Sequence, residues 1–573
     1  MTAAALDGPP VVARSDAGVA ARARSLSRRL PSVGLLAAIG YLVVFPLFRL
    51  QELALADGAA AYDRAFSTPR FGETLWMTVQ LAIGSLVIAM VLGTAMAWCS
   101  TRLPRRLGFL KAVPLFPIIL PGAANVAGWA FLLSPRPGYL NALLRNLPWW
   151  SHLDEGPVDI YTLPWIVILT GFSLTAFVYL FVSNGLRSIN SELLEAARVA
   201  GDSSTKTFFK VTIPLLRPVM LYGAGVALLL GLGQFTAPMF LGRNEGIDVI
   251  TTLMYRSVSQ SPVDHSVAAA LGSPLLLFGV LIVIAQKVML GDHSRFVTHG
   301  GKAFRSQERP SKLAAAAIVL FGVVSTALPL GALVLVALTP YWSGDIDTSQ
   351  WSLDNFRTAF GESGITDSIA MSLGASIGAA LIALPLGYCA ATLLLRGRKR
   401  SIVRMAVDFL VAVPLGIPAV IFGAGFLLTY SRPPFILYGS SWVILLVYVT
   451  LMLPFTTRLQ LAGMVALGDG YVEAARTSGA SALRTNLQIV LPLMRSTLAG
   501  AGALIFILLS HEFAASLLVR SPTTQVMGTV LYDYWYNGGY PMVATIALIM
   551  SAVTVAGVGL ALAIGGSDIL DKL

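Results

Sequence analysis

Long apolar runs separated by short polar segments make up most of the chain. Twelve of these runs have about 20 residues, the length that an α-helix needs to cross the roughly 30 Å hydrocarbon core of a bilayer. The runs lie near residues 32–50, 74–99, 112–134, 161–183, 218–241, 265–286, 313–339, 368–395, 405–430, 440–457, 496–519 and 541–565. The pattern predicts an all-α membrane protein with about twelve transmembrane helices.

The polar segments contain a repeat. Residues 195–218, EAARVAGDSSTKTFFKVTIPLLRP, recur as residues 473–496, EAARTSGASALRTNLQIVLPLMRS, displaced by 278 positions without a gap. A second pair, Glu73-Thr-Leu-Trp-Met-Thr and Asp367-Ser-Ile-Ala-Met-Ser, is displaced by 294 positions. Each half therefore contains six spans, and an even number returns the second copy to the same orientation. The fold class expected is two parallel six-helix repeats related by an axis along the membrane normal.

The repeat also sets the expected domain boundaries. Residues 1–30 form a basic tail, residues 31–290 the first half with its core at about 71–290, residues 291–312 a polar linker, and residues 313–573 the second half with its core at about 367–565. The third span of each half carries a Pro-x3-Pro pair, at Pro117 and Pro121 and at Pro414 and Pro418. Each proline removes a backbone donor, so these two spans are expected to kink or break.

Charge predicts the orientation. Only 12% of the 573 residues are charged and 56% are hydrophobic, and 30 of the 40 Lys and Arg residues fall on the face that holds both termini. The positive-inside rule places this face, with both repeated loops, in the cytoplasm. The net charge of +11 is explained by contact with anionic membrane lipid, and no nucleic-acid partner is needed. Cys99 and Cys389 lack metal-ligand spacing, so no metal site is expected.

Each repeated loop is predicted to be a short helix that ends at a glycine. Glu-Ala-Ala-Arg has good helix propensity, and Gly201 and Gly479 permit a sharp turn about two helical turns later. Phe208, Phe209, Val211 and Ile213 then form an apolar patch that needs cover, and Pro214 is placed to open the next span at its first turn. A short helix, a bend and an apolar patch together predict a plug for a groove on another protein.

This pattern resembles the cytoplasmic signature of binding-protein-dependent ABC transporter permeases, Glu-Ala-Ala-x3-Gly-x9-Ile-x-Leu-Pro. The second copy matches every position, and the first departs only by Val211 and Ile213. The resemblance implies type-1 permease domains fused in one chain, each with a helix that couples to a cytoplasmic ATPase subunit. The implied coupling residues are Glu195, Ala196, Ala197, Gly201 and Pro214, with Glu473, Ala474, Ala475, Gly479 and Pro492.

Within this family the chain is most similar to ferric-iron importers, on the segments QFTAPMFLGR (234–243) and EFAASLLVR (512–520). The resemblance implies an inner-membrane permease of a bacterial cell, and the Lys and Arg distribution places both of its termini in the cytoplasm. It implies two ABC ATPase subunits that use the ATP, a periplasmic or extracellular solute-binding protein, and no cofactor bound by the chain itself. Importers of 2-aminoethylphosphonate, thiamine or polyamine remain alternatives within the same class.

Two other functional classes, an enzyme and an ion-coupled secondary transporter, fit the sequence less well. No catalytic residue is expected, since the chain has no G-x4-G-K-[ST] phosphate loop and no paired intramembrane histidines that a haem enzyme would need. An ion-coupled secondary transporter with twelve spans is the stronger rival. Such carriers hold several ionisable residues deep in the membrane, whereas this chain has chiefly Glu512, with Asp408 near a span's cytoplasmic end.

Two residues are candidates for the translocation path. The displacement of 278 carries Gln234-Phe-Thr-Ala onto Glu512-Phe-Ala-Ala, toward the outer ends of the fifth and eleventh spans. A carboxylate facing lipid near mid-span costs about 2.5 kcal/mol or more, so Glu512 is expected to face the interior, satisfied by His511 or by a polar path. The alternative is a carboxylate that reaches the outer membrane interface. We expect Gln234 and Glu512 to line the path near its outer gate, where a carboxylate suits a cation or a ferric ion.

Overall fold

The twelve predicted spans are present as helices. The computed structural model describes residues 14–189, 191–290, 310–397 and 401–565. In this part of the chain every regular element is helical, nine helices are long and apolar enough to cross a membrane, and three further spans are bent pairs of helices. The linker, apart from its last three residues, and the start of the basic tail lie outside the described residues.

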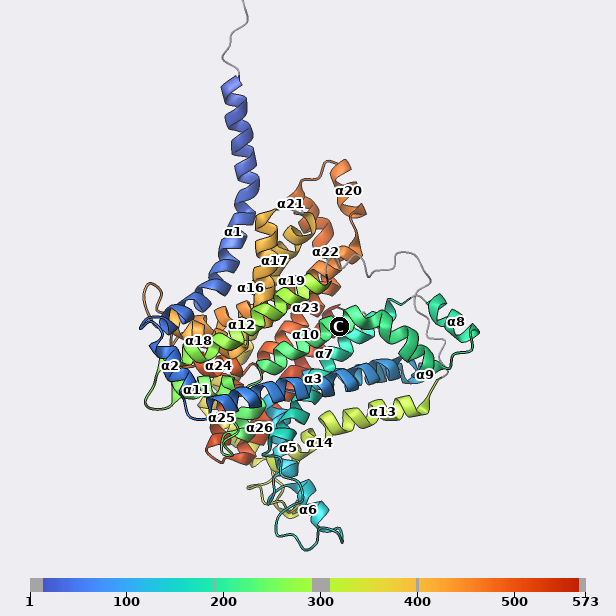
Figure 1. The fold of residues 1–573 in the computed structure, drawn as a ribbon, viewed down its shortest axis with the longest axis vertical. Helices are drawn as coiled ribbons and strands as arrows, with labels where there is room; N and C mark the ends of the chain where they lie inside the picture. Colours follow the sequence, from blue (N-terminus) through green and yellow to red (C-terminus); the bar gives the residue numbers. More distant parts are fainter. Residues whose placement is uncertain (1–13, 190, 291–309, 398–400, 566–573) are drawn as a thin grey trace, which may run out of the picture.

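The spans and the loop helices of the two halves occur in the same order along the chain, although α6 of the first half has no counterpart between α18 and α19 (Figure 1). The first half contains α1 (Arg14–Ala54), α2 (Ala60–Phe66), α3 (Phe71–Thr101), η1 (Arg105–Leu115), α4 (Phe116–Ile119), α5 (Gly122–Leu133), α6 (Tyr139–Arg145), α7 (Leu163–Arg187), α8 (Ser191–Val199), α9 (Ser204–Thr207), η2 (Phe208–Thr212), α10 (Ile213–Leu232), η3 (Pro238–Gly242), α11 (Ile250–Ser259) and α12 (His265–Leu290). The second half contains α13 (Lys312–Gly322), η5 (Val323–Ala327), α14 (Leu328–Ala337), η6 (Thr348–Gln350), α15 (Asp354–Gly361), α16 (Ser363–Arg396), α17 (Ile402–Gly416), α18 (Ala419–Tyr430), α19 (Ser441–Leu467), α20 (Gly470–Thr477), α21 (Ala482–Thr485), η7 (Asn486–Val490), α22 (Leu491–Leu493), α23 (Arg495–Ser510), α24 (Ala514–Val519), α25 (Met527–Tyr536) and α26 (Tyr540–Gly565).

The predicted proline breaks are confirmed. Leu120 and Ile417, which precede Pro121 and Pro418, are extended, with ψ of 123° and 127°. The ring of a following proline disfavours the helical region for the residue before it, so the helix stops there. The chain then continues as α5 and α18, bent by 91° and 108° from the preceding helices.

The two halves exchange their first spans. Helix α1 packs on α17 and α18 of the second half, while α13 and α14 pack on η1 and α5 of the first half. A Cβ atom at Gly128 would lie 2.4 Å from the carbonyl oxygen of Pro329, and one at Gly425 would lie 2.9 Å from that of Pro46. These backbones touch because glycine leaves the space, as in other close helix contacts within membranes. The two halves are therefore interlocked rather than placed side by side.

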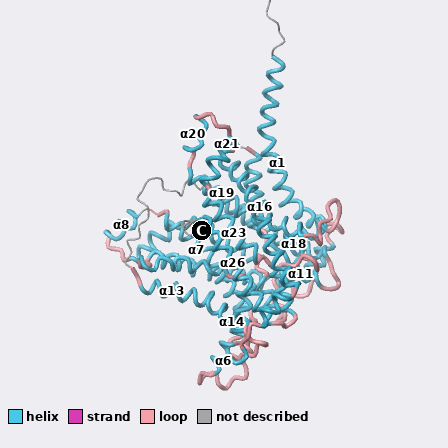
Figure 2. The backbone as a smooth tube through the Cα atoms, turned by 180° about the vertical axis from the view of Figure 1, so that it is seen from behind, coloured by secondary structure: helices cyan, strands magenta, loops and turns pink. Residues whose placement is uncertain are grey.

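The two repeated loops project from the same side of the bundle, apart from each other. Helices α8 and α20 project at the right and upper right of Figure 1, and α2, α11 and α25 lie at the lower left. Figure 2 shows from behind that α8 and α20 lie away from α11. Proteins that bind α8 and α20 would therefore approach from one side, and helices α11 and α25 belong to the opposite side.

Two predicted span ends are wrong. Hydropathy predicts continuous spans over 218–241 and 496–519, but the helices end at Leu232 and Ser510. The chain then resumes as η3 and α24 after a short non-helical step. Both runs stay apolar through the break, so hydropathy alone does not reveal it.

Candidate functional site

Each repeated loop forms the expected helix and turn. Helix α8 contains Glu195 to Ala197, and α20 contains Glu473 to Ala475. Val472 and Ala475 of α20 are buried against the bundle, at 5% and 6% exposure, while Glu473 and Ala474 are exposed. Helix α20 therefore rests on an apolar edge and presents its acidic and small residues to the solvent.

Both loop glycines are in the left-handed region of the backbone. The φ angle is +86° at Gly201 and +79° at Gly479, so a side chain is strained at either position, although nothing lies within 4 Å of the place that its Cβ atom would take. The amide of Asp202 donates to the carbonyl of Ala197 at 3.1 Å, and the amide of Ala480 donates to that of Ala475 at 3.0 Å. These six-to-one bonds are those of a Schellman cap, which ends a helix at a residue with positive φ.

The chain restarts in the same way after each turn. Ser203 and Ser481 are the N-cap residues of α9 and α21, and each hydroxyl accepts the amide hydrogen three residues later at 3.3 Å. In the first loop, Lys206 forms an ion pair with Asp202 at 2.9 Å and lowers the pKa of that carboxyl below its usual value. Helix, glycine turn and serine cap thus recur as one unit with the same geometry.

The predictions for Pro214 and Phe208 hold only in part. Pro214 lies in the first turn of α10, as predicted, but the fifth span itself begins earlier, at Ser204. Each loop proline follows a π-turn, η2 or η7. The π-turn closes with a bond from residue i to i−5, which accommodates a proline that lacks a donor. Phe208 is buried at 7% exposure and stacks on Trp98 with ring centroids 4.7 Å apart. Of the predicted apolar patch, only Phe209, which is 63% exposed, faces outward.

Glu512 lies at the break after α23 and binds the start of α24. Its carboxylate accepts hydrogen bonds from the amides of Ala515 at 2.8 Å and Ser516 at 2.9 Å, and from the Ser516 hydroxyl. A carboxylate at a helix N-terminus satisfies donors that the helix leaves unpaired. Within the described residues no hydrogen bond joins Glu512 to His511, the partner that the sequence suggested.

Gln234 occupies the equivalent break after α10. Its Nε2 donates to Thr170 Oγ1 at 3.2 Å, and its Oε1 accepts from the amide of Phe235 at 3.0 Å. Gln234 and Glu512 therefore both hold the local backbone at the break that follows the long helix of their half. The structure places them in the equivalent positions that the sequence predicted.

Phe235 and Phe513, which directly follow Gln234 and Glu512, contact each other between the two halves. The rings of Phe235 and Phe513, again displaced by 278 positions, have centroids 5.5 Å apart and are almost fully buried. Tyr255 of α11 packs on Phe235, and Tyr532 of α25 packs on Phe513, with centroids 5.8 and 5.5 Å apart. We call these four residues the aromatic closure. It was not predicted from the sequence, although the repeat displacement that selected Gln234 and Glu512 also pairs the two phenylalanines.

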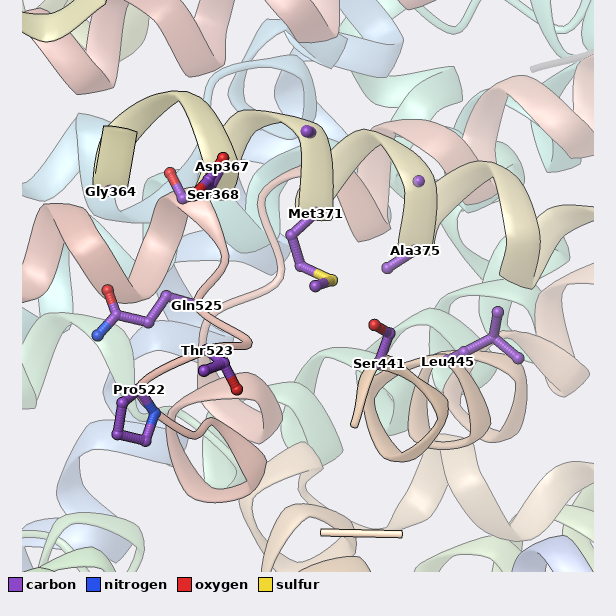
Figure 3. A pocket seen from close by; sticks show the side chains of 12 residues that line it. Gly364, Asp367, Ser368, Met371, Ala375, Ser441, Leu445, Pro522, Thr523 and Gln525 are labelled. Atoms are coloured by element: carbon purple, nitrogen blue, oxygen red, sulfur yellow. The ribbon is translucent and has the colours of Figure 1, made fainter. Parts of the chain in front are cut away.

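A separate pocket of about 680 Å³ lies on the flank of the second half. Figure 3 shows Asp367 and Met371 of α16 on one side of it, and Ser441 of α19 and Gln525 of the loop before α25 on the others. Asp367 is its one acidic residue. The described part of the chain contains no cluster of three His, Cys, Asp or Glu residues that could hold a metal ion.

Comparison with known proteins identifies the family. The model of the family described as "Binding-protein-dependent transport system inner membrane component" matches residues 74–290 and 383–565, more than half of the chain. A ferric transport system permease protein of Actinobacillus pleuropneumoniae is 27% identical over 479 residues, which cover 82% of this chain and 68% of that protein. A probable ABC transporter permease of Sinorhizobium fredii is 25% identical and covers 85% of each chain. The spermidine/putrescine permease PotB of Escherichia coli is 25% identical over 223 residues, which cover 38% of this chain and 77% of PotB.

The two matched segments lie one in each half of the chain, and each segment contains one helix, glycine turn and serine cap. The many apolar helices fit a protein that crosses the inner membrane several times. The chain belongs to the family of binding-protein-dependent transport system inner membrane components, with two copies of the family's domain fused in one chain, and it is the permease of an ABC importer.

Proposed function

We propose that this permease imports ferric iron, powered by two cytoplasmic ATPase subunits that dock on α8 and α20. The observation that carries the proposal is the pair of matching docking elements on one side of the bundle, each a short helix ended by a Schellman cap. Two such elements suit two copies of one ATPase subunit. The chain contributes no phosphate loop of its own.

The substrate is proposed from the relatives. The ferric transport permease aligns with 82% of this chain, across both halves, whereas the spermidine/putrescine permease aligns with 38% of it. A soluble binding protein would deliver the iron to the side that holds α11 and α25. In this proposal both termini and both docking helices are cytoplasmic, as the distribution of Lys and Arg indicates.

The first prediction tests the energy source. The purified chain alone is expected to hydrolyse no ATP above background. Proteoliposomes that contain the chain, its ATPase subunits and its binding protein loaded with ferric ion should accumulate radioactive iron only when ATP is supplied.

Three results would contradict the proposal. Hydrolysis by the chain alone would overturn the assignment of ATPase activity to a partner. Uptake driven by a proton gradient without ATP would favour an ion-coupled transporter. ATP-driven uptake of spermidine, thiamine or 2-aminoethylphosphonate, with no uptake of iron, would keep the importer class and replace the substrate.

A further inference from the structure

The second spans of the two halves, α3 and α16, hold the outer helices by equivalent hydroxyl groups. Thr78 Oγ1 of α3 accepts the amide hydrogen of Ile250 at 3.0 Å, and Ser372 Oγ of α16 accepts that of Met527 at 2.9 Å. Ile250 and Met527 are the first residues of α11 and α25. The hydroxyls are displaced by 294 positions and the amides by 277, so the same contact occurs once in each half.

These contacts are specific rather than incidental. Thr78 and Ser372 are 2% and 1% exposed, so water does not compete for the bond. The amide of Val249, directly before α11, donates to Thr252 Oγ1 at 3.0 Å. The amide of Val526, directly before α25, donates to Thr529 Oγ1 at 3.1 Å. A helix leaves its first amides without a partner inside the helix, and the hydroxyl of the second span satisfies the next one.

Helices α11 and α25 carry the two tyrosines of the aromatic closure. Tyr255 lies five residues after Ile250 on α11, and Tyr532 lies five residues after Met527 on α25. Each tyrosine packs on the phenylalanine of its own half, Phe235 or Phe513. A displacement of α3 or α16 would therefore move the tyrosines against the phenylalanine pair.

The opposite ends of the same two spans hold the repeated loops. Arg102 directly follows α3, stacks on Trp98 at 3.9 Å, and donates to the hydroxyl of Ser204 at 2.5 Å. Arg396 ends α16 and donates to Oδ1 of Asn486 at 3.3 Å. The two arginines are displaced by 294 positions, like Thr78 and Ser372, and their partners lie three residues after Gly201 and seven residues after Gly479.

We infer that α3 and α16 are continuous links that connect the repeated loops to the aromatic closure, with Thr78, Ser372, Arg102 and Arg396 as positioning residues. Helix α16 continues across Pro385 as a single helix. The inference rests on the proposed docking of ATPase subunits at α8 and α20. In each span 24 residues separate the hydroxyl from the arginine, which corresponds to about 36 Å of helix. Movement of a docked loop reaches the outer side through one continuous helix whose two ends are hydrogen-bonded to the parts that move.

The test uses the complete complex of permease, ATPase subunits and iron-loaded binding protein in proteoliposomes, with ATP hydrolysis measured with and without the binding protein. Thr78→Val and Ser372→Ala remove the hydroxyls with little change in volume. Each is expected to lower the stimulation by binding protein about fivefold, the factor that corresponds to one lost hydrogen bond, and to leave the basal hydrolysis unchanged. Thr78→Ser and Ser372→Thr keep the hydroxyl and should restore the stimulation.

Matched controls lie on the same two helices. The hydroxyl of Thr78 also donates to the carbonyl of Thr74 of its own helix, at 2.7 Å. Ser85 of α3 and Ser376 of α16 are fully buried too, and among the contacts of the described residues their hydroxyls make only bonds of this second kind. Ser85→Ala and Ser376→Ala should therefore keep wild-type stimulation. Ser372→Ala removes only a hydroxyl group and is the smallest of the changes. If Thr78→Val reduces the yield of the complex, Ser372→Ala alone still tests the inference.

The outcomes separate the inference from the proposed function. Wild-type stimulation in both Thr78→Val and Ser372→Ala would overturn the inference, and so would an equal loss in Thr78→Ser, because the hydroxyl would then not be the cause. If the wild-type chain does not assemble with the ATPase subunits, the proposed function is wrong, and the inference that rests on it is wrong too.

Discussion

Gly479→Val is expected to abolish capture of the ATPase subunit while the amount of chain in the membrane stays normal. Gly479 has a φ of +79°, and a β-branched residue in this region costs about 1–3 kcal/mol. The Schellman cap of α20, which depends on this angle, would open. The helix would then leave the orientation in which it presents Glu473 and Ala474.

The measurement is co-purification of the ATPase subunit with the tagged chain, together with iron uptake. Gly201→Val should act in the same way on α8, since Gly201 has the same geometry. Gly479→Asn should retain partial capture, because asparagine tolerates the left-handed region better than valine does.

Gly538 provides a matched control at the other side of the bundle. It has a φ of +78° and ends α25, where the amide of Gly539 donates to the carbonyl of Tyr534 at 2.9 Å in another Schellman cap. Gly538→Val therefore introduces the same backbone strain away from α8 and α20. It should retain the ATPase subunit, and loss of capture in this control would show that strain alone, rather than its place, disrupts the complex.

Repetition within the sequence made much of the fold predictable. The displacement of 278 positions located α8 and α20, and Pro121 and Pro418 located two of the three bent spans. Each of these features leaves a local mark, since glycine and proline restrict or release particular backbone angles. The helix ends at Gly201 and Gly479 could therefore be predicted without knowledge of their neighbours.

Contacts between spans could not be predicted in the same way. Lipid and neighbouring helices are both apolar, so the sequence of α1 does not indicate that it packs on α17 and α18 of the other half. The breaks at Gln234 and Glu512 contain no proline, and they depend on hydrogen bonds to segments that follow. Thr78 resembles any other hydroxyl residue of an apolar helix until its partner, Ile250, is known.

Glu512→Gln is expected to lower iron uptake about tenfold while the ATPase subunit remains bound, because a lost hydrogen bond to a charged group costs about 1.5–3 kcal/mol. Both carboxylate oxygens accept hydrogen bonds from the start of α24. An amide has one acceptor oxygen, and its NH2 group would face backbone donors. The next residue, Phe513, belongs to the aromatic closure, so loss of this cap would displace one of the two central rings.

The same argument predicts the behaviour of neighbouring variants. Ser516→Ala removes one donor to Glu512 and should lower uptake less than Glu512→Gln does. Gln234→Ala removes the bond to Thr170 and the support of the Phe235 amide, so it should also lower uptake. Ser551→Ala is the control, since this buried hydroxyl bonds only to a carbonyl of its own helix, Ala547, among the contacts of the described residues.

Normal uptake in both Glu512→Gln and Gln234→Ala would exclude the two residues from the translocation path. If Glu512→Gln lowers iron uptake and Ser516→Ala does not, the carboxylate acts by binding the iron itself and not by holding the start of α24.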